Sequence, residues 1–393
     1  MKSRTLSMIL VVLLTAAAAP AQAQTLRFSG FGDFIFGAVG GAKVDPTAAQ
    51  EFETFGSDQD PVNTNRGFGV TGTDFVIFAD MTDAMTFLGE INFQTGRGGS
   101  ADIEIDVERF FVNYQIDPRF NLQGGLFFTP IGYNNRFLYA RAWLMNSIQV
   151  PDFFEEELNL FPTHSTGVAA HGEFTLRNGH RLAYIVSVAN GRPHTPNSAV
   201  YARDYTNNKE TTGLVEWLIP GFRDSRVGVS GWFGNIDSVR VGGLGEVVTA
   251  ATTDSLTLRE RGVDAYLIVN HRWFGINAEY VRSNQHDRTG SQKGSAYITQ
   301  GGLIEVSARL AQGKLHPYVR FDRTTLPDGG GPYLSLREVD GGYTRVSVPE
   351  FKAAMTGAAF DVNQHLRVKA EYIRHLAGPR QRHGAAFQMA FGF

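Results

Sequence analysis

The chain has 393 residues, a formal net charge of −3 and no cysteine. The lack of cysteine excludes a disulfide framework, and the weakly acidic balance argues against nucleic acid as a partner. The 44 glycines and 30 phenylalanines suit a sheet that faces lipid on one side and water on the other.

The first residues predict export. Lys2 and Arg4 precede an apolar run, and Ala21-Gln22-Ala23 forms a small-residue cleavage site. We therefore expect residues 1–23 to be a signal peptide, with the mature domain spanning 24–393 at a net charge of 34 − 39 = −5. No later window is long and apolar enough for a transmembrane helix.

Segments with a period near two occur along the whole chain and predict sixteen strands. Their expected ranges are 25–39, 66–80, 84–95, 103–116, 119–129, 165–176, 180–190, 210–219, 224–235, 257–271, 273–284, 295–311, 314–324, 348–362, 365–376 and 382–393. In one example, Phe274, Ile276 and Tyr280 alternate with Asn277 and Glu279. A soluble β-sandwich gives the same alternation within each strand. A bulge would swap the faces in 66–80, 103–109 or 348–362.

The connections between these strands are alternately long and short. The stretches 41–65, 130–164, 191–209, 236–256 and 325–347 are long, whereas "DMTDAM", "IDPRF", "RNGH" and "VNQH" are short. This order predicts an all-β, antiparallel up-and-down transmembrane barrel with short periplasmic turns and long extracellular loops.

Aromatic residues lie at both ends of the predicted strands, in positions that match the alternation of short and long connections. One predicted girdle lies beside the short turns and comprises Tyr114, Phe120, Trp217, Trp273 and Phe393. A second is expected toward the opposite rim and comprises Phe36, Phe93, Tyr280, Phe321, Phe351 and Tyr372.

In its signal peptide, its sixteen predicted strands and its ending "AAFQMAFGF", the sequence resembles Gram-negative outer-membrane porins. The resemblance implies an outer-membrane location among lipid and lipopolysaccharide, a homotrimer, and passage of small solutes. It also implies that the assembly machinery recognises Phe387, Met389, Phe391 and Phe393. These four residues could equally serve only as the last lipid-facing strand.

The stretch "LQGGLFFTPIGYNN" is similar to the Gly-x-x-x-x-Pro-x-Gly region of the phosphate-selective porin O/P family. That family lines its pore with Arg and Lys, and this chain departs from it because its predicted inward charges are mixed. The predicted pore-wall residues are Arg27, Asp33, Glu90, Arg109, His171, Glu173, Glu279, Arg309, Arg320, Arg367, Lys369 and Glu371.

A barrel of about sixteen strands is too wide to be filled by its own side chains, so it encloses an aqueous lumen that some segment must narrow. In porins the third outer loop folds inward, so the resemblance points to the connection 130–164, with a short helix expected over 135–147. Its charges would then set a transverse field across a constriction. The residues concerned are Arg136, Arg141, Asp152, Glu155, Glu156 and Glu157. The alternatives are an outward, solvated loop or a contact with a neighbouring protomer.

The remaining polar groups predict no cofactor and no metal site. The acidic residues of 41–65 match no calcium loop, and the glycines of "GFGDFIFG" precede no helix. His164, Ser165, His171 and Glu173 lie close together in sequence without a nucleophile motif, so we expect no enzyme.

The leading hypothesis is an outer-membrane porin, a passive diffusion channel for small hydrophilic solutes or ions. The alternative is an occluded barrel that acts as a surface-binding or structural protein through its long loops. A third possibility is a soluble exported β protein.

Overall fold

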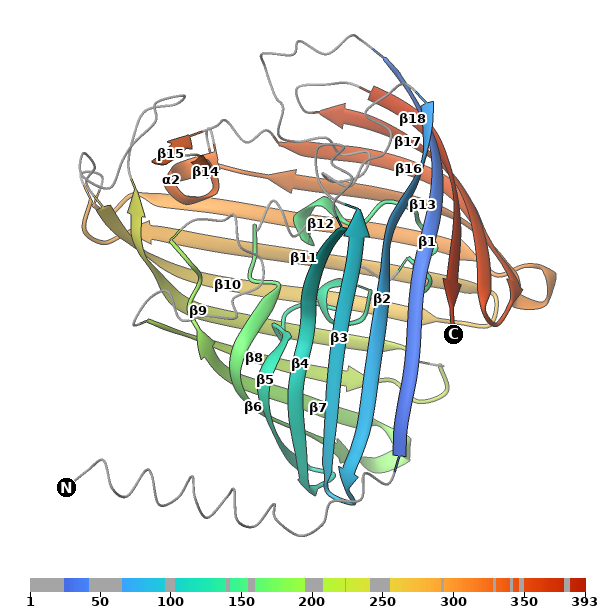
Figure 1. Ribbon diagram of the computed structural model, residues 1–393, viewed down its shortest axis with the longest axis horizontal. Helices are drawn as coiled ribbons and strands as arrows, with labels where there is room; N and C mark the ends of the chain where they lie inside the picture. Colours follow the sequence, from blue (N-terminus) through green and yellow to red (C-terminus); the bar gives the residue numbers. More distant parts are fainter. Residues whose placement is uncertain are drawn as a thin grey trace.

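The computed structural model describes residues 25–41, 66–95, 103–138, 142–154, 160–194, 208–222, 224–240, 255–290, 293–327, 330–339, 342–345, 350–377 and 382–393. These residues form a closed barrel in which every strand is antiparallel to its neighbours (Figure 1). The strands follow one another around the barrel in chain order, so the predicted up-and-down topology is confirmed.

The barrel contains sixteen strands, one for each predicted range. They are β1 (Thr25–Gly41), β2 (Arg66–Thr82), β3 (Met85–Thr95), β4 (Ile103–Asp117), β5 (Phe120–Phe128), β6 (His164–Thr175), β7 (Arg181–Asn190), β8 (Lys209–Leu218), β9 (Arg226–Arg240), β10 (Ser255–Asn270), β11 (Phe274–Asp287), β12 (Ala296–Ala308), β13 (Leu315–Thr325), β16 (Phe351–Asn363), β17 (Leu366–Ala377) and β18 (Arg382–Gly392).

Smaller elements lie in the connections. The β13–β16 connection holds the helical turn α2 (Gly331–Leu334) and a hairpin of β14 (Leu336–Val339) and β15 (Gly342–Arg345). The β5–β6 connection holds a π-helical turn, η2 (Asn134–Leu138), and a 3₁₀ turn, η3 (Asp152–Phe154). Two short turns between strands contain 3₁₀ turns, η4 (Arg177–Gly179) and η5 (Ala311–Gly313).

The distribution of side chains is the reverse of that in a soluble protein. Large apolar residues such as Phe28, Val168 and Phe387 are at least 60% exposed on the outer surface, whereas Asp264 and Arg320 are buried on the inside. Alternation along each strand produces this separation, as in β11, where exposed Tyr280 follows buried Glu279. Such a surface requires lipid contact, because water would leave this apolar area unfavourably solvated.

The last strand closes the barrel against the first. β18 pairs with β1 in a register that sets Phe34 opposite Met389 and Phe36 opposite Phe387. The side chains of Phe387, Met389, Phe391 and Phe393 all point outward and are exposed. Two backbone hydrogen bonds join Phe393 to Gly30, at 3.0 and 2.9 Å, so the final residue completes the seam.

The first predicted girdle has the expected exposure, and in the second set Phe93, Tyr280, Phe321 and Tyr372 are exposed. Tyr114, Phe120, Trp217, Trp273 and Phe393 are exposed beside the short turns. Phe351 is an exception, because its partner in the register is the fully buried Thr324 and its side chain therefore points into the barrel. A bulge does interrupt 103–109: Glu90 pairs with Arg109 but Ile91 pairs with Val107, which changes the phase of β4.

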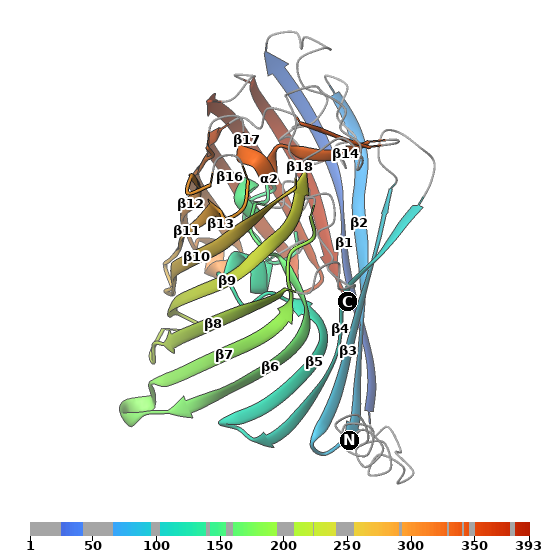
Figure 2. The same ribbon diagram turned by 90° about the vertical axis from the view of Figure 1, so that its left-hand side faces the viewer.

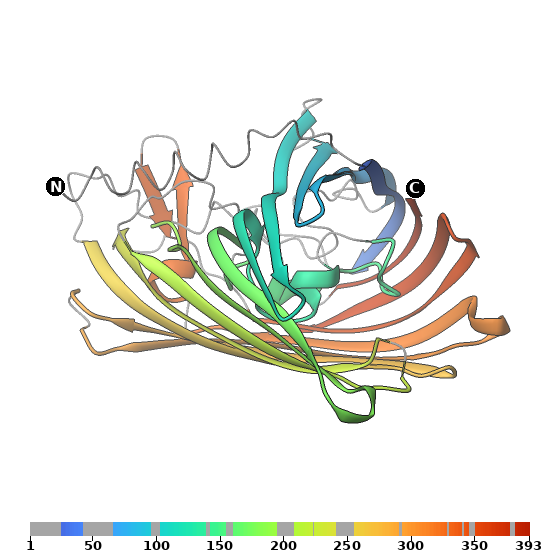
Figure 3. The ribbon, with the colours of Figure 1, turned by 90° about the horizontal axis from the view of Figure 1, so that it is seen from below.

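One connection lies inside the barrel. In Figures 2 and 3 the teal-green segment between β5 and β6 runs within the curve of the sheet instead of extending beyond its rim. None of the helices in the described ranges has both the length and the apolar character needed to cross a bilayer.

Deletion of Phe393 should impair barrel assembly. The deletion removes both hydrogen bonds to Gly30 and the contact of the terminal ring with Phe75, whose ring centroids are 6.2 Å apart. We expect a smaller fraction of protein with the heat-modifiable gel mobility of a folded barrel, and an unchanged unit conductance in the molecules that insert. Phe120→Leu, an exposed girdle substitution away from the seam, is the control. Normal assembly with an altered conductance would contradict this prediction.

Candidate pore constriction

The connection between β5 and β6, residues 129–163, is closed at its base by polar contacts. The Thr129 N–H donates to the Thr163 carbonyl at 2.8 Å. Asn135 Nδ2 then donates to the carbonyls of both Thr129 and Thr163, at 3.0 and 3.1 Å. All three residues are buried, so these bonds satisfy groups that have lost their contact with water.

Residues 131–138, here called the first arm, attach to the wall through Glu279 of β11. One oxygen of this carboxylate, Oε2, accepts hydrogen bonds from the backbone N–H groups of Tyr133 (3.2 Å) and Asn134 (2.9 Å), and from Asn134 Nδ2 (2.5 Å). Gly132, immediately before them, has a φ of +65°, and a Cβ there would lie 2.0 Å from Glu279 Oε1. A glycine is therefore needed for the arm to approach this carboxylate.

Ion pairing and aromatic contacts hold the other side of the first arm. Arg136 forms an ion pair of 3.1 Å with Glu216 of β8, and Arg226 of β9 lies 3.6 Å from the same carboxylate. The Arg226 guanidinium also stacks over the Phe137 ring at 4.7 Å. Burial raises the pKa of the Tyr133 phenol, so this side chain stays neutral.

Residues 142–149, here called the second arm, contain no charged side chain. The wall supplies the charges, and most of them bind the backbone of the arm. Lys369 Nζ donates to the carbonyls of Ala142 and Ser147, while Glu371 accepts from the N–H groups of Ile148 (3.0 Å) and Gln149 (3.3 Å). Arg367 Nη1 donates to the Met145 carbonyl at 3.2 Å.

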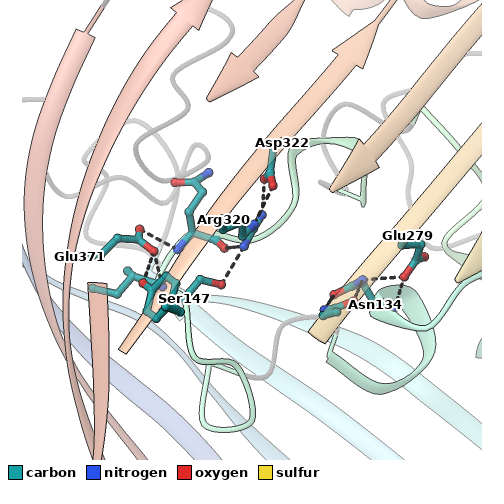
Figure 4. A network of polar contacts seen from close by, with 10 residues as sticks. Asn134, Ser147, Glu279, Arg320, Asp322 and Glu371 are labelled. Carbon is teal, nitrogen blue, oxygen red and sulfur yellow. Dashed lines mark hydrogen bonds and ion pairs between the residues drawn. The ribbon is translucent and has the colours of Figure 1, made fainter. Parts of the chain in front are cut away.

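Arg320 of β13 bonds both to the second arm and to Asp322 of its own strand (Figure 4). Its Nη1 donates to Ser147 Oγ at 2.7 Å and to the Gln149 carbonyl at 2.6 Å, while its other nitrogens pair with Asp322. Both charged side chains are almost fully buried. A buried charge is tolerated only when it is paired and hydrogen-bonded, and here the second arm completes that set.

These attachments show that the connection crosses the interior. Its base belongs to β5 and β6, whereas the second arm is bonded to β13 and β17. In the closed order, β13 is eight strands from β5 in either direction, since 13 − 5 = 8 and 16 − 8 = 8. A segment that joins opposite walls of a closed barrel must pass through its lumen.

An apolar cluster lies inside the barrel, at the ends of the strands that lead into the long loops. Phe153, Phe154 and Phe161 of the connection pack there against Trp232 of β9 and Tyr333 of α2. Phe153 lies on Gly301 of β12, where a Cβ would be 2.5 Å from the Phe153 Cβ. The fully buried Arg192, in the β7–β8 connection, stacks over Tyr333 at 4.8 Å and pairs with Glu260 at 2.8 Å. Parts of three connections therefore meet in this cluster.

A cavity remains between the two arms and the wall. It is bounded by β10 to β13, and most of its lining is polar. Among the lining residues are Asn134, Asn146, Asn270, Asn277, Glu305 and Arg309.

Of the six predicted constriction residues, only Arg136 has a described side chain, and it is paired with Glu216 as given above. Arg141, Glu155, Glu156 and Glu157 lie outside the described residues, as does the side chain of Asp152. The helix expected over 135–147 is wrong in its second half: after the single turn η2, residues 142–149 form turns whose backbone groups bond to the wall.

The twelve predicted wall residues fall into two groups. Glu279, Arg320, Arg367, Lys369 and Glu371 contact the connection directly. The others contact the barrel itself: Arg27 pairs with Asp80, Glu90 with Arg109 and Glu173 with Arg181, while Asp33 bonds to Gln388, His171 to Asn113 and Arg309 to Asn270. Arg27 lies at the rim, where its side chain is mostly exposed.

His164 and Ser165 bond to different partners. His164 Nε2 lies 2.9 Å from a Glu108 oxygen, whereas the Ser165 hydroxyl bonds to Thr129 Oγ1 at 2.8 Å.

Sequence reasoning missed the neutral residues of the arms. Asn134, Asn146 and Ser147 bond to Glu279, Glu305 and Arg320 of the wall. It also left Asp264 unassigned, although the alternation of β10 places it on the inward face beside Tyr266. That periodicity could have identified Asp264, but nothing in the sequence pairs the arms with particular strands.

Arg320→Met should lower the free energy of unfolding by about 3–5 kcal/mol, because it leaves Asp322 buried without its cation. Arg320→Met/Asp322→Leu should recover most of this loss. The control is Arg27→Met, whose largely exposed ion pair with Asp80 predicts a cost of about 0–1 kcal/mol. Guanidinium unfolding from detergent micelles measures all four proteins. Equal costs for Arg27→Met and Arg320→Met would contradict the structural role of Arg320.

The sequence matches no family model and no curated protein. Solved structures match it along almost the whole chain. In-vitro folded OmpT of Vibrio cholerae, an outer membrane protein in trimer form, has a TM-score of 0.56 at 9% identity, over 94% of this chain and 99% of that one. The outer membrane channel DcaP of Acinetobacter baumannii has a TM-score of 0.57 at 12% identity, over 94% and 97%. OprB of Pseudomonas putida has a TM-score of 0.52 at 10% identity, over 94% of each chain. The fold of this chain is therefore that of bacterial outer-membrane barrels.

Proposed function

We propose that this protein is an outer-membrane diffusion channel for small hydrophilic solutes or ions, without enzymatic activity. The observation that carries the proposal is the crossing of the lumen by residues 129–163, held by charged wall residues such as Arg320, Lys369 and Glu371. A barrel of sixteen strands is too wide for its own side chains to fill. The connection then sets the size of the passage, and fixed charges beside it sort the permeating solutes.

The fold supports this proposal without defining the solute. DcaP, a barrel of similar fold, is an outer membrane channel. The trimer form of OmpT supports a homotrimer here. Likeness to the phosphate-selective branch depends on the Gly125–Gly132 stretch alone, and the mixed inward charges favour a less specific channel. Export through cleavage before Gln24, recognition of the last strand by the assembly machinery, and a field from Arg141 and Glu155 to Glu157 belong to the same proposal.

A second candidate function is favoured by the apolar cluster. Because Phe153, Tyr333 and Arg192 bring three connections together in the lumen, the barrel could be occluded and its long loops could serve in surface binding. The two functions differ in whether the barrel conducts ions.

Replacement of residues 142–149 by a four-residue Gly-Ser linker tests the channel. The wild type, refolded and inserted into planar bilayers, should give discrete single-channel steps. Without the second arm the unit conductance should rise roughly twofold or more, because the lumen loses its crossing segment. Lys314→Met, a change at an exposed lysine on a short turn, is the control and should leave the conductance unchanged.

Three results are distinguishable in this experiment. Conductance steps in the wild type that become larger in the linker variant support a constricted channel. Conductance steps in the linker variant alone would show that the wild-type barrel is occluded and that the second arm helps to block it. Identical conductance in both proteins would remove the second arm from the constriction.

A further inference from the structure

Three strands of the barrel carry the same short pattern on their outer face: an aromatic residue, one further residue, and then arginine. The pattern is Tyr280–Arg282 on β11, Phe321–Arg323 on β13 and Tyr372–Arg374 on β17. The aromatic and the arginine side chains are all exposed on the outside of the barrel. Because each of these strands begins at a short turn, each arginine lies one step nearer the outer rim than its aromatic residue.

Neighbouring strands join the three arginines into one line of cations. Lys352 of β16 lies directly opposite Arg323 in the register and is the diagonal neighbour of Arg374. Arg261 of β10, also exposed, is the diagonal neighbour of Arg282. Direct and diagonal neighbours on one face are within reach of each other's long side chains. These residues are here called the basic arc: Arg261, Arg282, Arg323, Lys352 and Arg374.

The arc keeps close to one height of the barrel. On β12, which separates its two halves, Gln300 lies opposite Arg282 and Gly302 lies opposite Arg323. Each diagonal step of the arc therefore moves two residues toward the short turns. The successive short turns are displaced along the register in the same direction, because the strands of a barrel are tilted. The basic side chains thus line one level of the outer surface, just beyond the aromatic girdle.

Within the described ranges, none of the five side chains of the basic arc forms an ion pair or a hydrogen bond. Inward-facing cations such as Arg320 have carboxylate partners, whereas Lys352 contacts only the Phe321 ring, at 5.7 Å from its centroid. Glu350, exposed just before β16, pairs with no member of the arc. Like charges directly opposite each other, as Arg323 and Lys352 are, destabilise a sheet. An anion from outside the chain would relieve this repulsion.

The arc is confined to one side of the barrel. On the outer face of β1 to β7, the exposed side chains described toward the same rim include Phe34, Phe93, Val107 and Val188, all apolar. A general attraction to an anionic membrane surface would favour cations all round the rim. Their restriction to β10 through β17 instead indicates a discrete binding surface.

We propose that the basic arc binds the phosphate groups of a lipopolysaccharide molecule in the outer leaflet. Guanidinium groups match phosphate oxygens bidentately, and a series of them can hold more than one phosphate. The surface beside the arc, toward the short turns, favours a lipid over a free anion, because the exposed Ile304 and Val319 there offer contact to acyl chains. The inference rests on the outer-membrane location in the proposed function and is independent of conduction.

The test measures binding of fluorescently labelled lipid A, the diphosphorylated and acylated anchor of lipopolysaccharide, to the refolded protein in detergent micelles by fluorescence anisotropy. We expect saturable binding that unlabelled lipid A reverses. Dephosphorylated lipid A should compete roughly tenfold or more weakly, because it lacks the charge that the arc recognises. Sodium phosphate at millimolar concentration should not compete, since it has no acyl chains.

The triple variant Arg323→Gln/Lys352→Gln/Arg374→Gln should weaken binding on the order of a hundredfold, since each Lys or Arg beside an anionic lipid surface contributes about a factor of five. The matched control is Arg177→Gln/Arg272→Gln/Lys314→Gln. It removes the same charge from three exposed residues on short turns at the other rim, so it should bind lipid A as the wild type does. Heat-modifiable gel mobility shows that each variant is folded. If the triple variant does not fold, Arg323→Gln and the competition series on the wild type decide the question.

Equal competition by dephosphorylated lipid A would overturn the proposal and assign binding to the acyl chains alone. Displacement by sodium phosphate would overturn it in favour of a free-anion site. An equal loss of binding in the control variant would show that net charge, and not the arc, is responsible. Because no arm measures conductance, the lipid site can fail while the channel function holds, and the reverse.

Discussion

The contact between the charged inner wall and the backbone of the β5–β6 connection is the interaction on which the rest of the structure depends. Arg320, Lys369 and Glu371 point into the barrel because strand alternation leaves them no other direction. They are buried and therefore largely shielded from water. The N–H and carbonyl groups of 142–149 supply the missing partners. Neither the wall nor the arm satisfies its polar groups without the other.

This dependence explains why an uncharged segment can hold a fixed path across a lumen. The wall binds main-chain atoms of the second arm and the side chains of Asn146 and Ser147, so only the apolar side chains there remain to pack. Trp143 packs on Gly392 of β18, close to the seam of the barrel. The connection thus links the strands that close the barrel to the wall on the far side.

Much of the fold follows from short-range pattern. Alternation in segments such as Phe274–Tyr280, with turns of two to seven residues at one end, requires antiparallel neighbours, and an exposed apolar face requires lipid. The single error among the girdle aromatics, Phe351, occurs at the start of a strand, where few alternating residues fix the phase. In β4 the bulge at Glu108 reverses the phase midway. The sequence marked 103–109 as a stretch where a bulge would swap the faces, but it did not show whether a bulge occurs there or at which residue.

The sequence by itself determined the membrane barrel, its strand order and many of the inward charges, because each depends on residues that are close together in the chain. Only the tertiary structure decided which of those charges meet the connection. The pairs Asn134 with Glu279 and Ser147 with Arg320 are separated by 145 and 173 residues. Such pairs arise because closure of the sheet places opposite walls face to face across one lumen. A periodicity within one strand carries no information about which distant residue will lie opposite it.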